Sequence, residues 1–81
     1  MGRYEKILDR VLSGRADQNI DFDDLVRLLE YKGFTKRHRG GSHQIFTKSG
    51  VTEMINLQSD GPKAKAYQVR QVRSVLTKYS L

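Results

Sequence analysis

Two histidines, His38 and His43, are the side chains of this chain best suited to proton transfer near neutral pH, and its 81 residues include no cysteine. The two histidines lack the spacing of a helical zinc motif, so we expect no metal site. Ser42 directly precedes His43, and adjacent strand residues point to opposite faces, which argues against a serine hydrolase. The Gly40-Gly41 pair matches neither a P-loop nor a dinucleotide-binding motif. The sequence therefore predicts a protein without a metal or a small-molecule cofactor.

His43 is the stronger catalytic candidate because it begins an expected strand, directly after a basic segment and a Gly-Gly turn. An unperturbed histidine has a pKa of about 6.5 and can accept or donate a proton. RNA supplies its own nucleophile: the 2′-hydroxyl can attack the adjacent phosphate if a base takes its proton, an acid protonates the leaving 5′-oxygen and cations neutralise the phosphorane. The alternative, that His43 is a polar surface or structural residue, stays open. For His38, a solvated position or a phosphate contact is the better hypothesis.

The net charge of +6 is concentrated in the second part of the chain. Residues 1–33 contain six Lys or Arg and seven Asp or Glu, whereas residues 34–81 contain nine and two. A one-sided positive field is typical of a protein that binds a polyanion, usually nucleic acid; the weaker alternative is a generic surface charge that favours solubility. We expect the following residues to contact RNA: Lys36, Arg37, Arg39, Ser42, Lys63 and Lys65.

Two lysines, Lys63 and Lys65, lie at the expected start of the last helix. Free backbone N–H groups there favour anions, so Lys63 and Lys65 could hold a phosphate, or they could be solvated loop residues. Tyr67 and Tyr79 could stack on bases, although tyrosines on a terminal helix more often lie at the edge of a core or on the surface.

The pattern of apolar residues predicts the order α-α-β-β-β-α. Helical spacing extends over residues 3–13, 22–32 and 66–79. Strand formers or alternation mark three strands, at residues 34–39, 42–48 and 51–57. Glycine and proline indicate that residues 58–65 are a connector outside the sheet. We therefore expect an α+β fold in which helices cover one face of a small three-stranded antiparallel sheet and leave the other face open.

The chain length indicates one domain, residues 1–81, in which residues 1–20 add a helix and a loop. The first residues contain no apolar run of the length of a signal peptide or a membrane span. The absence of cysteine fits a reducing compartment. We expect a cytoplasmic protein with no membrane partner.

Residues 22–81 resemble the HicA-type mRNA interferase toxins of bacterial and archaeal toxin–antitoxin systems. The family's marker is a G-S-H-x-x-F segment, which Gly41, Ser42, His43 and Phe46 match. A helix precedes this segment, and a third strand and a closing helix follow it, in the family's order.

The resemblance implies a double-stranded-RNA-binding-domain-like fold and a ribosome-independent endoribonuclease that cleaves mRNA. It implies that His43 is the essential strand histidine, that Lys63 and Lys65 lie where such domains hold phosphates, and that the partner is a HicB-type antitoxin. Many relatives have a second histidine where this chain has Gln44, which cannot carry a proton at neutral pH. A mechanism that needs both histidines would not operate here. The N-terminal helix is also an addition to the family's pattern.

Two other functions remain open on the sequence. A non-catalytic RNA-binding module would recognise the A-form backbone by shape with the same basic residues, and it would differ from the enzyme in never shortening RNA. An interaction protein would dock a partner on the open face or edge of the sheet, but this function does not explain the concentrated charge.

Overall fold

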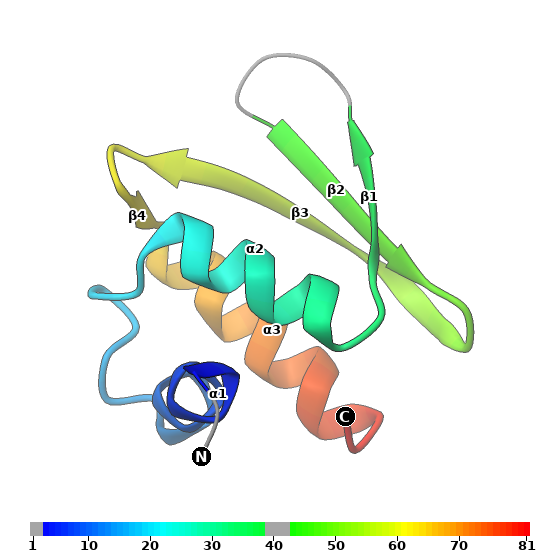
Figure 1. Cartoon of the computed structure of the whole chain (residues 1–81), viewed down its shortest axis with the longest axis horizontal. Coiled ribbons are helices and arrows are strands. Elements are labelled where there is room, and N and C mark those ends of the chain that lie inside the picture. The colour runs from blue at the N-terminus through cyan, green and yellow to red at the C-terminus, as the bar shows by residue number, and fades with distance from the viewer. Residues whose placement is uncertain (1–2, 39–42) are drawn as a thin grey trace.

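The computed structural model describes residues 3–38 and 43–81, which form three helices and one four-stranded sheet. The helices are α1 (Arg3–Ser13), α2 (Phe22–Tyr31) and α3 (Ala66–Lys78), and the strands are β1 (Thr35–His38), β2 (His43–Lys48), β3 (Val51–Asp60) and β4 (Lys63–Ala64). All neighbouring strands are antiparallel, in the order β1-β2-β3-β4. The sheet lies against α2 and α3, and α1 packs on the opposite side of these helices (Figure 1). The expected α+β class and the order of the helices are confirmed.

The expectation of three strands is wrong, because residues 58–65 belong largely to the sheet. β3 continues to Asp60, and after a turn in which Gly61 has a φ of 60° the chain returns as β4. Ser59 then lies opposite Ala64 in an antiparallel pair. Lys63 is therefore a strand residue, and the helix begins only at Ala66.

β4 is held on its second edge by residues 20–22, where the loop enters α2. The N–H of Phe22 donates a hydrogen bond of 3.0 Å to the carbonyl of Pro62, and the N–H of Ala64 donates one of 2.9 Å to the carbonyl of Ile20. Proline has no N–H to contribute to a ladder, but its carbonyl still accepts. Because these partners are distant in the sequence, no local pattern of strand formers marks β4.

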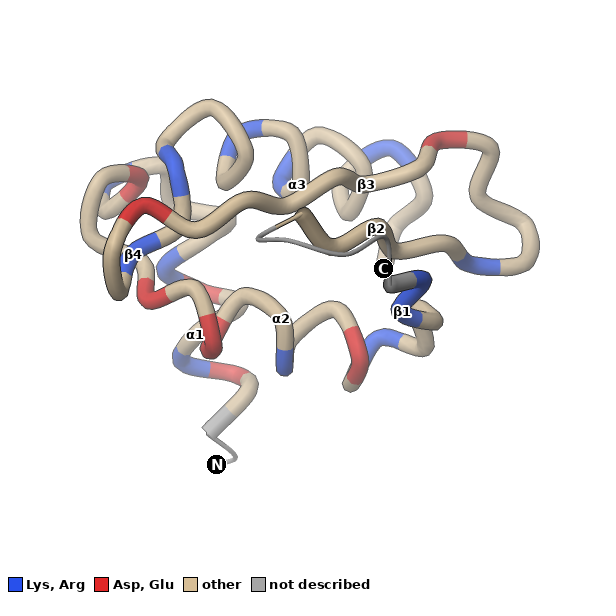
Figure 2. The backbone as a smooth tube through the Cα atoms, turned by 90° about the horizontal axis from the view of Figure 1, so that it is seen from above, with Lys and Arg blue, Asp and Glu red and all other residues tan. Residues whose placement is uncertain are grey.

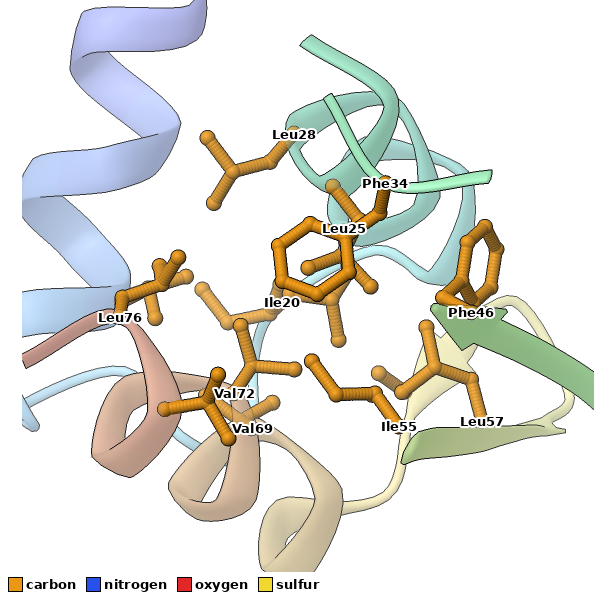
Figure 3. Packing of buried hydrophobic residues seen from close by; sticks show 14 of the residues in the cluster. Ile20, Leu25, Leu28, Phe34, Phe46, Ile55, Leu57, Val69, Val72 and Leu76 are labelled. Atoms are coloured by element: carbon orange, nitrogen blue, oxygen red, sulfur yellow. The ribbon is translucent and has the colours of Figure 1, made fainter. Parts of the chain in front are cut away.

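The hydrophobic core fills the space between α2, α3 and one face of the sheet, here called the inner face. Phe46 of β2 and Ile55 and Leu57 of β3 project into the same core cluster as Val69 and Val72 of α3 (Figure 3). Phe46 lies directly opposite Ile55 across β2 and β3. Successive strand residues point to opposite faces, so the alternation of β3 places every second side chain on the outer face, which remains open to solvent. Among the described helices, none has the length and apolar composition that a membrane span requires.

α1 is attached to the rest of the molecule by apolar packing and by one arginine. Ile7 and Val11 of α1 are buried in the core. Arg73 of α3 donates from Nη1 and Nη2 to the two carboxylate oxygens of Asp17, at 2.8 and 3.1 Å. Its Nη1 also donates to the carbonyl of Val11 at 3.1 Å. Arg73 therefore links α3 both to the end of α1 and to the loop that follows it.

Glu53 of β3 fastens the C-terminal end of α3 to the sheet. Its carboxylate accepts a hydrogen bond of 2.6 Å from the hydroxyl of Tyr79 and one of 2.9 Å from the ammonium of Lys78. The bond from Tyr79, followed by that from Lys78, lowers the pKa of Glu53 to about 2. The Tyr79 hydroxyl also accepts a hydrogen bond from the N–H of Thr52 at 3.3 Å.

The low pKa of Glu53 predicts a loss of stability in acid. A carboxyl group whose pKa is lower in the folded state stabilises the fold above its ordinary pKa, and that contribution disappears as the pH falls through the folded value. For Glu53 the window extends from the ordinary value of 4.5 down to about 2. We expect Glu53→Gln to be less stable than the parent near pH 6, with the difference shrinking steadily toward pH 2. Urea unfolding midpoints of both proteins across this range measure it, and parallel curves would contradict the assignment.

Candidate nucleic-acid interface

His43 is exposed on the outer face of the sheet, at the first position of β2. It lies directly opposite Gln58 of β3 in the antiparallel register. Side chains at opposite positions share a face and have Cβ atoms about 4.5–5.5 Å apart. His43 and Gln58 are therefore immediate neighbours at the end of the sheet from which α3 begins.

Lys65 joins this pair from the residue that precedes α3. The Nζ of Lys65 donates a hydrogen bond of 3.4 Å to the side-chain oxygen of Gln58. Gln58 is also the residue opposite His43, so Lys65 contacts the cross-strand neighbour of the histidine. The structure thus brings together two of the residues that the sequence marked as candidates, although they are separated by the whole of β3.

Arg37 approaches His43 from the other side. It is exposed on β1 and lies opposite Ile45, two residues after His43 on β2. Diagonal neighbours on one face of an antiparallel pair are about 7–8 Å apart, which is within reach of an arginine side chain. We call the set of Arg37, His43, Gln58 and Lys65 the His43 surface. It places a histidine between two cations, an arrangement suited to a phosphodiester group.

The other candidate phosphate contacts do not join the His43 surface. Lys36 lies opposite Phe46, at an inner-face register position of the edge strand β1. Lys63 donates to the Oδ1 of Asp21 at 2.7 Å, and this bond lowers the pKa of the Asp21 carboxyl. Asp21 therefore binds a lysine instead of capping α2 with its side chain. Arg39 and Ser42 lie outside the described residues.

Gln44 points away from the candidate site. It lies opposite Leu57 on the inner face, and its side-chain oxygen is buried without a hydrogen-bond partner among the described residues. A side chain at this position does not share a face with His43. Gln44, the position at which the sequence departs from the resembled family's pattern, therefore faces the helices and not the outer face that carries His43.

Gln68 is a residue that sequence reasoning missed. At 2% exposure it is the one buried polar side chain that the described part of the chain contains. Its Oε1 accepts a hydrogen bond of 2.8 Å from the N–H of Gln58, and its Nε2 donates to the hydroxyl of Tyr67 at 3.4 Å. Its burial could have been predicted from its spacing, because a glutamine four residues before Val72 lies on the apolar stripe of α3.

The acidic residues are concentrated in one part of the fold. Most Asp and Glu positions lie on α1, on α2 and in the loop between them, whereas Lys and Arg positions occur on every helix (Figure 2). The excess of positive charge therefore belongs to residues 34–81, which include Arg37 and Lys65 of the His43 surface. Within residues 3–38 and 43–81, no group of three or more His, Asp or Glu side chains could hold a metal ion.

A comparison with models of protein families assigns most of the chain to a known family. The model described as the HicA toxin of bacterial toxin–antitoxin systems matches residues 22–78, from the first residue of α2 to the last residue of α3. Neither the curated proteins nor the solved structures gave a match. The family model covers well over half of the 81 residues. The chain therefore belongs to the HicA toxin family of toxin–antitoxin systems.

Proposed function

We propose that this toxin is an mRNA interferase, an endoribonuclease that cleaves mRNA in the cytoplasm without a metal ion and so blocks translation. The observation that carries the proposal is the exposed His43 beside Lys65 and Arg37 in a chain of the HicA family. The order from α2 to α3 is that of a double-stranded-RNA-binding-domain-like fold, α-β-β-β-α, with the two-residue strand β4 added before α3, and this order supports such a fold. The N-terminal helix is then an addition to that unit within a single domain.

In the proposed reaction His43 moves protons and the cations hold the phosphate. His43 takes the proton of the RNA 2′-hydroxyl as the 2′-oxygen forms a bond to phosphorus. The bond from phosphorus to the 5′-oxygen breaks, and the protonated His43 gives its proton to the leaving 5′-oxygen, so that the histidine returns to its neutral starting state. Lys65 and Arg37 neutralise the charge that develops on the phosphorane oxygens. The products are a 2′,3′-cyclic phosphate and a 5′-hydroxyl.

We also propose how the partner would act. A toxin needs an antitoxin, and we infer a HicB-type protein that covers the His43 surface with acidic groups matched to Arg37 and Lys65. The remaining basic candidates, Lys36 and Lys63 among them, would contribute to the general attraction of RNA.

A cleavage assay with two designed substrates tests this function. Purified toxin is incubated with a labelled mRNA in excess chelator, and the cut sites are mapped. We expect cleavage to continue in the chelator, because no step uses a metal ion. The same RNA with a single 2′-deoxynucleotide on the 5′ side of one mapped cut should resist cleavage at that site alone, because the nucleophile has been removed there.

The assay distinguishes the proposed enzyme from the alternative function, RNA binding without catalysis. A non-catalytic RNA-binding module would bind the transcript with a steep dependence on salt and leave its length unchanged. Cleavage that continues at the 2′-deoxy site would contradict the proposed chemistry, and cleavage that stops in the chelator would contradict the absence of a metal.

A further inference from the structure

Tyr67 presents an exposed aromatic ring beside the His43 surface. Its side chain stands in the first turn of α3, two residues after Lys65, and the residue is 55% exposed. Single exposed aromatic rings are common on protein surfaces, so the neighbours of Tyr67 decide what its ring could do. The position of Tyr67 is therefore of interest for what could cover it.

A chain of hydrogen bonds connects Tyr67 to the neighbour of His43. The Tyr67 hydroxyl accepts from the Nε2 of Gln68, and the Oε1 of Gln68 accepts from the N–H of Gln58. Both polar ends of the buried Gln68 amide are thus used to join the tyrosine to β3. Gln58 also receives the Lys65 ammonium and lies opposite His43. Hydrogen bonds thus link both the ring of Tyr67 and the ammonium of Lys65 to Gln58, the residue that lies opposite His43.

We propose that Tyr67 stacks on an unpaired RNA base next to the phosphate held at His43, which makes single-stranded RNA the substrate at the cut site. This inference rests on the proposed function. Aromatic side chains bind unpaired bases through their exposed π-faces, whereas both faces of a base within an A-form duplex are already stacked. Lys65 would hold a phosphate of the same nucleotide segment, and Gln68 is a positioning residue that fixes the ring.

A fluorescence experiment tests the stacking without depending on cleavage. The probe is a short single-stranded oligonucleotide of 2′-fluoro nucleotides, which lacks the nucleophile, with 2-aminopurine at successive positions in a series. We expect one position to be quenched when the parent toxin binds. Tyr67→Ala should abolish that quenching and weaken binding by roughly ten-fold to a hundred-fold, the range that base–aromatic stacking provides. Tyr67→Phe keeps the ring and should bind within about three-fold of the parent.

Matched controls define the outcome. Tyr31→Ala removes a tyrosine that is 61% exposed on another helix and should leave quenching unchanged. The same oligonucleotide annealed to its complement should bind the parent and Tyr67→Ala equally. Equal single-strand binding by these two proteins would overturn the inference even if mRNA is still cleaved. Tyr67-dependent quenching by a toxin that never cleaves RNA would uphold the stacking and overturn the proposed enzyme, so the two failures are distinguishable.

Discussion

Replacing His43 with alanine should slow mRNA cleavage at least about a hundred-fold, because a positioned general acid or base contributes roughly 100- to 10,000-fold to such a reaction. RNA affinity should remain within about three-fold of the parent, since the cations of Arg37 and Lys65 are retained. Initial cleavage rates and a filter-binding titration, both at fixed salt, measure the two quantities. Induction of the parent gene should arrest growth, and induction of the variant should not.

Two further variants make this result specific to proton transfer. His43→Gln keeps a polar side chain that can donate and accept hydrogen bonds but cannot carry a proton at neutral pH, so it should be as slow as the alanine variant. Asn56→Ala changes an exposed residue of β3 that lies opposite Ile45 on the same outer face, and it should cleave at the parent's rate. If His43→Ala stays as nucleolytic and as toxic as the parent, His43 has no part in the chemistry.

The elements that a short stretch of chain determines could be predicted from the sequence. The stripe of Val69, Val72 and Leu76 indicated α3, and the alternation of β3 indicated which residues face the core. β4 was not predictable in this way. Its two residues form a strand because backbone groups of Ile20 and Phe22, which are distant in the sequence, bond to this segment. The amino-acid composition of residues 63–64 does not indicate these partners.

The sequence indicated which residues could form the candidate site, but not which of them lie near one another in the fold. His43 and Lys65 were both marked by chemistry, yet only the register of β2 on β3 brings them to the same end of the sheet. Lys63 and Lys65 were equivalent candidates in the sequence, and the structure separates them because Asp21 pairs with Lys63. Gln58 and Gln68 have no chemistry of their own that would mark them, since their role depends on what they connect.

Replacing Arg73 with alanine should destabilise the protein by about 2–3 kcal/mol. Breaking a buried ion pair by removing one partner typically costs about 3–5 kcal/mol, and partial exposure reduces that figure. The Arg73 and Asp17 side chains are 25% and 14% exposed, so most of the cost remains. The variant also leaves the Val11 carbonyl without its side-chain donor. A domain of this size is stable by about 4–12 kcal/mol, so the loss corresponds to a fall in Tm of roughly 10–20 °C.

Two further variants test whether the stability depends on the geometry of the Arg73 guanidinium and not on its charge alone. Gly14 has a φ of 73°, and a Cβ there would lie 3.3 Å from the Nη1 of Arg73, so the chain turns tightly around this group. Arg73→Lys keeps the charge but loses the two parallel bonds to Asp17, and it should recover less than half of the lost stability. Arg70→Ala, at an exposed position of the same helix, should leave Tm unchanged. An equal fall in Tm for Arg70→Ala and Arg73→Ala would mean that the link between α3 and α1 makes no specific contribution to stability. In that case the apolar contacts of Ile7 and Val11 and the stacking of Tyr4 on Tyr31 would hold the N-terminal helix in place.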